Sequence, residues 1–512
     1  MGYKQISLKL PPDYTPEQLQ RKVAGSLHIH EFTFQIIHKS LDARNKHFIH
    51  WEVRLLVNSP QIKGGEPVKR ETLDIPTEKR KERAIVVGSG PAGFFAAYVL
   101  QKGGIQTQLI ERGTPVDKRS KEIEIFENSA RFFPKSNYAF GEGGAGTFSD
   151  GKLTSRSKRI SRERQFILQS YVQAGAPQEI EYLAHPHLGT DNLKTIVKNL
   201  RRNFLNLGGE ILFETQMTDL KTGKGEVTAI ETERGLMEAD YFILATGHSA
   251  FETYRMLLQR GVGFHTKNFA IGSRMEHPQE LINEAQWGVK HLAGVKAAEY
   301  RLTSPGDGKH SVYSFCMCPG GVIVPATAYH NTNIVNGMSR YKRNGVFANA
   351  AVVATLNLNR LLKKEVSAPE ALDWLEEKEK YFYEITSGYK APFCSIRSFM
   401  ERKILPPEIR ETSYPMGIVE IPLWELLPAA ISRALSRGLS DFKKRMKNFD
   451  HGNLLGLESK TSAPIQADRD KNGLSTGFRN LYLVGEGSGY AGGIVSSAAD
   501  GIKAAMHILQ KV

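Results

Sequence analysis

Cysteine is scarce in this chain, and long apolar runs are absent from it. Its 512 residues include three cysteines, too few for a disulfide scaffold. No segment reaches the roughly 18 consecutive apolar residues that a membrane-spanning helix needs. The first five residues begin no apolar core of the kind that a signal peptide carries. These absences predict a cytoplasmic protein with no membrane span.

The chain carries a net charge of +14 on an otherwise ordinary composition. Its hydrophobic content of 40% and charged content of 24% are typical of a globular protein, and its length predicts two or three domains. Basic residues gather in 156–164 and in 433–447. Such a surface attracts nucleic acid, an anionic membrane face or an acidic substrate. No recognised nucleic-acid module accompanies it, so we interpret it as a solvated basic face.

Residues 83–113 contain the parts of a dinucleotide site in the required order. An apolar strand over 84–87 is followed by glycines with G-x-G-x-x-G spacing and by a helix over 91–102. A second strand over 106–110 then ends at the acidic residue Glu111. The helix N-terminus attracts phosphate, and the acid suits the two hydroxyls of a ribose, which favours FAD or NAD over NADP. The residues predicted to bind are Gly88, Ser89, Gly90, Pro91, Ala92, Gly93, Glu111 and Arg112.

Three further regions favour FAD over NAD. A glycine-rich loop over 140–153 lets backbone lie against a planar ligand, and an apolar strand over 240–247 ends in small residues. A strand over 481–487 delivers an acid suited to the ribityl chain, and a helix follows whose N-terminus suits the flavin N1 edge. The predicted ligands here are Gly144, Gly146, Thr147, Lys152, Ala245, Thr246, Gly247, Gly485, Glu486, Gly492, Gly493 and Ile494.

With these motifs in view, the chain resembles the FAD-dependent oxidoreductases, or dehydrogenases, that carry a small N-terminal domain before the flavin fold. The resemblance implies an α/β protein with one FAD, a glutathione-reductase-type Rossmann fold and an inserted mixed β/α cap that forms a substrate domain. It supplies no substrate. The segments that carry it are 41–44, 141–153, 187–191, 314–321, 336–339 and 485–501.

The same patterns predict how the chain divides. Residues 1–75 read as a small α+β domain, with strands over 3–10, 32–39 and 49–57 and a helix over 16–24 that Thr15 caps. We expect the FAD-binding domain over 76–265 and again over 454–512. The inserted substrate domain is expected between them, over 266–453.

The sequence offers fewer candidates for catalytic residues than for cofactor ligands. Cys316 and Cys318 form a C-x-C pair that suits redox chemistry, or alternatively two small buried side chains on one strand face. Lys152 is an acid–base candidate, as are His248, Tyr329 and His330, although such residues are more often structural. No convincing spacing of cysteine and histidine predicts a metal site.

These features predict an FAD-dependent oxidoreductase that transfers a hydride between flavin and a small organic substrate. No second dinucleotide motif or C-x-x-C pair is present, so NAD(P)H is expected only as a transient donor, and an organic donor is the other route. Two alternatives remain open, an RNA-modifying flavoprotein and a non-catalytic flavin sensor. The sequence does not predict the oligomeric state.

Overall fold

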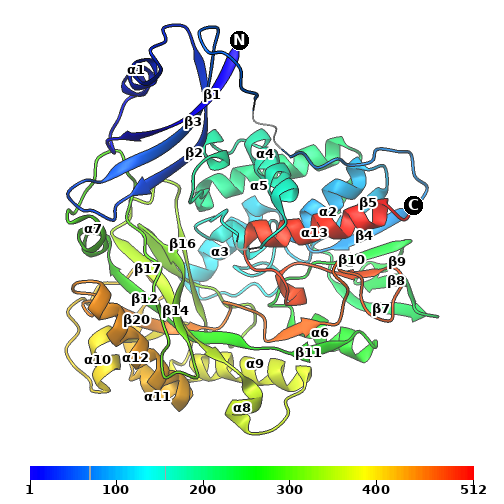
Figure 1. The fold of residues 1–512 in the computed structure, drawn as a ribbon. Helices are drawn as coiled ribbons and strands as arrows, with labels where there is room; N and C mark the ends of the chain where they lie inside the picture. Colours follow the sequence, from blue (N-terminus) through cyan, green and yellow to red (C-terminus); the bar gives the residue numbers. More distant parts are fainter. Residues whose placement is uncertain (68–70, 156) are drawn as a thin grey trace.

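The computed structural model describes residues 1–67, 71–155 and 157–512. The basic residue Arg156, at the start of the first basic stretch, lies outside the described residues. Figure 1 shows a small sheet at one end of the molecule and two larger sheet-based units below it. Within the described residues, no helix has both the length and the apolar character to cross a bilayer.

The N-terminal unit is a three-stranded antiparallel sheet covered by one helix. It comprises β1 (Gly2–Leu10), α1 (Pro16–Leu27), β2 (Thr33–Asp42) and β3 (His50–Ser59), in the strand order β1-β3-β2. Thr15 caps α1 through a capping box with Gln18, as its sequence predicts. Leucine, isoleucine and valine side chains from α1, β1, β3 and the segment after α1 form a separate small core.

The second unit contains the predicted Rossmann-type sheet. Its five parallel strands have the order β22-β10-β4-β5-β6, and an antiparallel sheet, β7-β8-β9, lies beside it. The strands are β4 (Arg83–Val87), β5 (Gln106–Ile110), β6 (Glu210–Leu212), β7 (Met217–Gly223), β8 (Glu226–Thr232), β9 (Gly235–Glu238), β10 (Tyr241–Leu244) and β22 (Leu481–Leu483). The helices are α2 (Pro91–Lys102), α3 (Val116–Ser129), α4 (Ser161–Gln173), α5 (Gly189–Asn206), α6 (Phe251–Gln259) and α13 (Ile494–Leu509).

The third unit is built on a mixed seven-stranded sheet in the order β13-β14-β17-β12-β20-β18-β19. Its strands are β12 (Phe269–Pro278), β13 (Thr303–Ser304), β14 (Val312–Cys318), β17 (Phe347–Leu356), β18 (Ala391–Ser395), β19 (Ile418–Glu420) and β20 (Asn453–Glu458). Its helices are α7 (Gln279–Trp287), α8 (Leu358–Leu362), α9 (Ala368–Ile385), α10 (Ile396–Glu401), α11 (Leu423–Leu426) and α12 (Ala429–Arg445). The strand pairs β11 (Phe264–Thr266) with β21 (Ile465–Ala467) and β15 (Gly321–Pro325) with β16 (Val335–Ser339) complete the fold. This arrangement confirms an α/β fold with an inserted mixed sheet.

One strand lies in a different unit from the one we expected. β20, which we assigned to the C-terminal part of the FAD-binding domain, pairs with β12 and β18 inside the seven-stranded sheet. All six of its residues are buried there. We therefore propose that the inserted unit ends after β20 rather than at residue 453.

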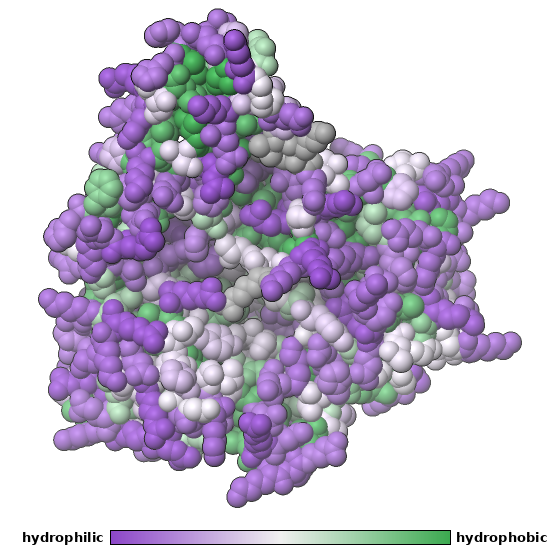
Figure 2. Space-filling model, in the orientation of Figure 1, coloured by the Kyte–Doolittle hydropathy of each residue, from purple (hydrophilic) through white to green (hydrophobic). Residues whose placement is uncertain are grey.

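The surface is mostly hydrophilic on the face shown in Figure 2. In the second basic stretch, Lys443 pairs with Asp450 at 2.8 Å and Lys444 with Asp441 at 3.2 Å, both at the end of α12. Part of the excess charge is thus matched locally by carboxylates.

The helices α2 and α13 pack unusually closely, and Figure 1 shows them side by side over the parallel sheet. Small residues make this possible. A Cβ added at Gly501 of α13 would lie 2.0 Å from the carbonyl oxygen of Ala92 in α2. Rotation of a side chain cannot relieve this clash, because the added Cβ and the carbonyl oxygen of Ala92 are both fixed to helix backbones.

We expect Gly501→Ala to force the two helices apart. The gain in helix propensity, about 1 kcal/mol, is smaller than the overpacking cost of about 1–3 kcal/mol, which a 2.0 Å backbone contact should push to its upper end. Chemical denaturation should therefore show a net loss of stability. Lys503→Ala, at a partly exposed position of the same helix, is the control. Equal midpoints for the two variants would contradict the packing argument.

Candidate functional site

The glycine-rich turn after β4 is compact, and it leaves the start of α2 open. Gly88 has a φ of 100°, and a Cβ there would lie 2.4 Å from the carbonyl oxygen of Ala245. A Cβ at Gly93 would lie 1.9 Å from the carbonyl oxygen of Gly88. Gly90 is the N-cap of α2, Pro91 follows it, and no side chain caps the helix. The first N–H groups of α2 are therefore free of side-chain caps and available to an anion.

Glu111 lies buried at the end of β5, where the sequence predicts a ribose ligand. One carboxylate oxygen accepts the backbone N–H of Ser89 at 2.9 Å and its hydroxyl at 2.8 Å. The other accepts the backbone N–H groups of Gly113 at 2.9 Å and Gly141 at 3.2 Å. A carboxylate has about four acceptor positions, so all are filled. To bind a ribose, Glu111 needs the Ser89 hydroxyl to rotate away.

Arg112, also predicted to bind the cofactor, has close protein contacts. Its guanidinium pairs with Glu252 of α6 and lies 4.1 Å from the centroid of the Phe140 ring. These contacts fasten α6 to the end of β5. Arg112 therefore supports the turn through protein contacts.

The loop over 141–146 lies directly on the start of both helices. A Cβ at Gly144 would lie 3.0 Å from the Cα of Gly90, and a Cβ at Gly146 would lie 3.2 Å from a side-chain carbon of Ile494. Thr147 continues the loop in a short 3-10 helix (Ala145–Phe148) and accepts a hydrogen bond from Thr190 at its carbonyl.

A buried arginine that the sequence analysis missed holds this loop. Arg119 of α3 is fully buried and donates to carbonyl oxygens of the loop and of the segment before it. The acceptors are Asn137, Tyr138, Gly141, Glu142 and Gly144. Nothing in the local sequence distinguishes Arg119 from a solvated helix arginine, because its partners are carbonyls of a separate loop.

The two remaining predicted segments meet beside the turn. A Cβ at Gly487 would lie 2.7 Å from the carbonyl oxygen of Gly247, and one at Gly485 would lie 2.8 Å from the Cβ of Ala92. Glu486 faces His248, with 3.7 Å between a carboxylate oxygen and Nδ1. Thr246 contacts the hydroxyl of Tyr254 at 3.3 Å. The four predicted segments thus converge at the carboxyl edge of the parallel sheet, the edge where open α/β sheets bind ligands.

The N-terminus of α13 also lies at this edge of the parallel sheet. Its N-cap is Gly493, with a φ of 80° and no side-chain cap. Gly247, Gly492 and Gly493 have no atom within 4 Å of an added Cβ. Their open surroundings and the uncapped N–H groups form a cradle that fits a flat, anionic ligand.

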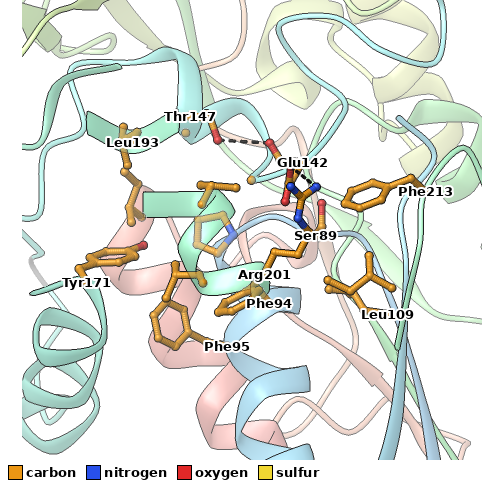
Figure 3. A pocket seen from close by; sticks show the side chains of 17 residues that line it. Ser89, Phe94, Phe95, Leu109, Glu142, Thr147, Tyr171, Leu193, Arg201 and Phe213 are labelled. Atoms are coloured by element: carbon orange, nitrogen blue, oxygen red, sulfur yellow. Dashed lines mark hydrogen bonds and ion pairs between the residues drawn. The ribbon is translucent and has the colours of Figure 1, made fainter. Parts of the chain in front are cut away.

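A pocket opens beside the turn, between α2, α4 and α5 (Figure 3). The predicted site residues Ser89, Pro91, Gly146, Thr147 and Ile494 are part of its lining, together with aromatic and aliphatic side chains that include those of Phe94, Phe95 and Tyr171. Glu142 and Arg201 form an ion pair at 3.2 Å in its wall. Among the described residues, one oxygen of Glu142 has no hydrogen-bond partner, and burial raises the pKa of this carboxyl.

Lys152 belongs to a buried ionic network at the junction of the two larger units. Asp150 pairs with Lys152 at 2.5 Å and with Arg343 at 2.6 Å, and Glu299 pairs with Lys152 at 3.6 Å. Burial alone would lower the pKa of Lys152, but the two carboxylates outweigh it and raise that pKa. Lys152 is therefore an ammonium ion at neutral pH and cannot act as a general base.

The other acid–base candidates are occupied by structural contacts. The Tyr329 hydroxyl donates to the Ser249 carbonyl at 2.7 Å and accepts the N–H of Phe251 at 2.8 Å. The ring of His330 packs edge-on against Phe132. His248 differs, because its Nε2 is buried without a partner in the described part of the chain, while its Nδ1 faces Glu486.

Three family models match successive parts of the chain. A domain of unknown function (DUF8436) matches residues 3–58. The pyridine nucleotide-disulphide oxidoreductase model matches residues 82–284, and a model described as FAD-dependent protein, C-terminal domain-like, matches residues 268–461. The last two matches correspond to the parallel-sheet unit and the seven-stranded unit.

A protein of Clostridium beijerinckii named "Uncharacterized protein" is 38% identical to this chain, covering 99% of this chain and 98% of its own length. Solved structures are similar only distantly. FqzB has 15% identity and a TM-score of 0.38, with 86% of this chain and 78% of that chain covered. Glycine oxidase from Bacillus cereus has 11% identity and a TM-score of 0.32, with 84% and 96% covered. The similarity along the whole relative and the three domain matches show that the chain belongs to the family of FAD-dependent oxidoreductases that the sequence motifs indicate.

Proposed function

We propose that this chain binds one FAD at the carboxyl edge of its parallel sheet and catalyses hydride transfer to or from a small organic substrate. The observation that carries the proposal is the convergence of four separate segments on two uncapped helix N-termini, those of α2 and α13. Two such N-termini at one sheet edge provide positive potential at both ends of an elongated anionic ligand.

The residues of the edge divide between the parts of the dinucleotide. Gly90 and the first N–H groups of α2 would hold the pyrophosphate, and Glu111 would hold the adenosine ribose once the Ser89 hydroxyl turns away. Glu486 suits the ribityl chain. Gly493 and the first N–H groups of α13 suit the pyrimidine edge of the flavin. When bound, FAD supplies two-electron chemistry that no side chain provides.

The chain's own contribution to the chemistry is positioning and a fixed hydrogen-bond donor. Lys152 follows the glycine loop directly, and its side chain is 30% exposed, whereas Asp150 behind it is buried. Carboxylates thus hold the ammonium group, while part of the Lys152 side chain is accessible. We propose that the ammonium group donates a hydrogen bond to the substrate or to the flavin from this accessible side.

The glycine at position 90 gives a direct test of FAD binding. A Cβ there would contact only the Cα of Gly144, at 3.8 Å, which is an ordinary contact. Gly90→Ala should therefore fold normally, while its methyl group occupies the place where backbone approaches the pyrophosphate. We expect the purified wild-type protein to be yellow and the variant to retain at least about tenfold less flavin, a loss of about 1.4 kcal/mol in binding.

The control is Gly25→Ala in α1, where an added Cβ meets no atom within 4 Å. Its flavin content, measured by visible absorbance, should equal that of the wild type. A wild-type protein that stays colourless after incubation with FAD would overturn the proposed function.

Anaerobic mixing with NADH or NADPH identifies the electron donor. If a nicotinamide nucleotide docks transiently, the visible flavin absorbance should bleach on mixing. The nucleotide that bleaches it at the higher rate is the donor. Absence of bleaching with both, in protein that dithionite still bleaches, would assign the donor role to the organic substrate.

The ionic network around Lys152 should be essential to folding. Asp150→Asn leaves two cations with reduced compensation in a buried site, and we expect a loss of about 3–5 kcal/mol in the free energy of unfolding. Asp117→Asn is the matched control, because this aspartate is 68% exposed and pairs with Lys198 at the surface. Its effect should be below about 1 kcal/mol. Denaturation midpoints that shift equally in both variants would refute the argument.

A further inference from the structure

The C-x-C segment departs from regular strand geometry. On β14, Phe315 lies opposite Ala351 of β17, and Cys318 lies opposite Asn349. β14 thus has one residue more than its partner between these pairs, which defines a β-bulge. Cys316 lies in the bulge with a φ of 44°, in the left-handed region that side chains rarely adopt. Bulges redirect side chains, and here the Cys318 thiol lies 3.3 Å from the carbonyl oxygen of Cys316.

A fully buried arginine holds the bulge in place. The Arg274 guanidinium donates to the Cys316 carbonyl at 2.7 Å and lies 3.5 Å from the Cys318 sulfur. Its other nitrogens bind Glu458 at 2.9 Å and the Asn349 side chain at 2.8 Å. One positive charge therefore lies against the Cys316 carbonyl and the Cys318 sulfur, while hydrogen bonds fix its position.

Cys316 and Cys318 differ in exposure and in thiol pKa, as a nucleophilic cysteine and its resolving cysteine do. Cys316 is partly exposed, whereas Cys318 is buried. A hydrogen bond from Cys318, helped by Arg274 and Lys152 and opposed by burial and Glu458, lowers the pKa of Cys316 to about 7. The same contact and burial raise the pKa of Cys318. The partly exposed residue of the pair is thus the one whose thiol ionises near neutral pH.

We propose that Cys316 and Cys318 form a redox-active dithiol that reduces disulfides by thiol–disulfide exchange. The Cys316 thiolate attacks one sulfur of a disulfide RSSR, so that a Cys316–S–S–R bond forms and one RS⁻ leaves. Cys318 then loses its proton and attacks the Cys316 sulfur, which releases the second RS⁻ and forms the Cys316–Cys318 disulfide. Two electrons pass from the pair to RSSR, and an external dithiol returns them by the reverse exchange.

The third cysteine shows what a purely structural thiol looks like in this fold. Cys394 lies in β18, is buried, and has a pKa that burial raises to about 12. It has neither a neighbouring cysteine in the sequence nor a cation among the groups that set its pKa. Cys394 therefore serves as the internal control for reactivity.

The test is intact and peptide mass spectrometry of the full-length protein after incubation with oxidised glutathione. The wild type and Cys394→Ser should each lose two hydrogens, with residues 316 and 318 linked and no glutathione retained. Cys318→Ser should retain one glutathionyl group on Cys316, because the resolving thiol is missing. Cys316→Ser should react on the order of tenfold more slowly or not at all.

Two outcomes would overturn the proposal. The first is a wild-type protein that stays in the dithiol form while its denatured chain reacts. The second is Cys316→Ser that reacts as fast as Cys318→Ser. Circular dichroism verifies that each serine variant is folded. Because the readout is mass and requires no bound FAD, its failure leaves the proposed flavin function untouched, and loss of flavin binding leaves this test unaffected.

Discussion

The close approach of α2 and α13 is the constraint on which the rest of the site depends. Without a Cβ at Gly501, the C-terminal helix lies against the carbonyl of Ala92, and both helices begin at the same edge of the parallel sheet. Gly90 and Gly493, which are far apart in the sequence, thereby become N-caps without a side-chain cap at this one edge. A helix N-terminus carries about half an elementary charge, so the packing places two positive helix ends at the edge where an elongated anion can reach both.

A second constraint joins the parallel-sheet unit to the seven-stranded unit. Asp150 follows the glycine loop, Arg343 precedes β17, and their buried ion pair spans the junction. Lys152 belongs to the same network and also lowers the pKa of Cys316. The loop proposed to contact flavin and the bulge proposed to exchange disulfides therefore share one electrostatic environment. A change of charge at Asp150 alters the electrostatic potential at both the loop and the bulge.

Elements whose sequence signals lie within a few residues of each other were predicted well. The helix over 91–102, the strand over 106–110 and the Thr15 cap agree with the structure, because the chemistry that defines them is local. The bulge at Cys316, the role of Arg119 and the place of β20 were not predictable in this way. Each depends on a partner from a distant segment, such as Asn349 for the bulge, and periodicity carries no information about such partners. Site residues predicted by glycine spacing converge, whereas the contact of Arg112 with Glu252 joins segments far apart in the sequence and was not predictable from it.

The charge balance around Lys152 constrains what the site can recognise. Two cations, Lys152 and Arg343, face two carboxylates, Asp150 and Glu299, at distances between 2.5 and 3.6 Å. Their charges cancel, and the surplus of +14 lies elsewhere on the protein. An anionic substrate gains little long-range attraction from a neutral cluster, since opposite fields at this separation largely offset one another. Selection at this point therefore depends on hydrogen-bond geometry at the accessible face of Lys152, and a substrate with a carbonyl or hydroxyl acceptor fits it as well as a carboxylate does.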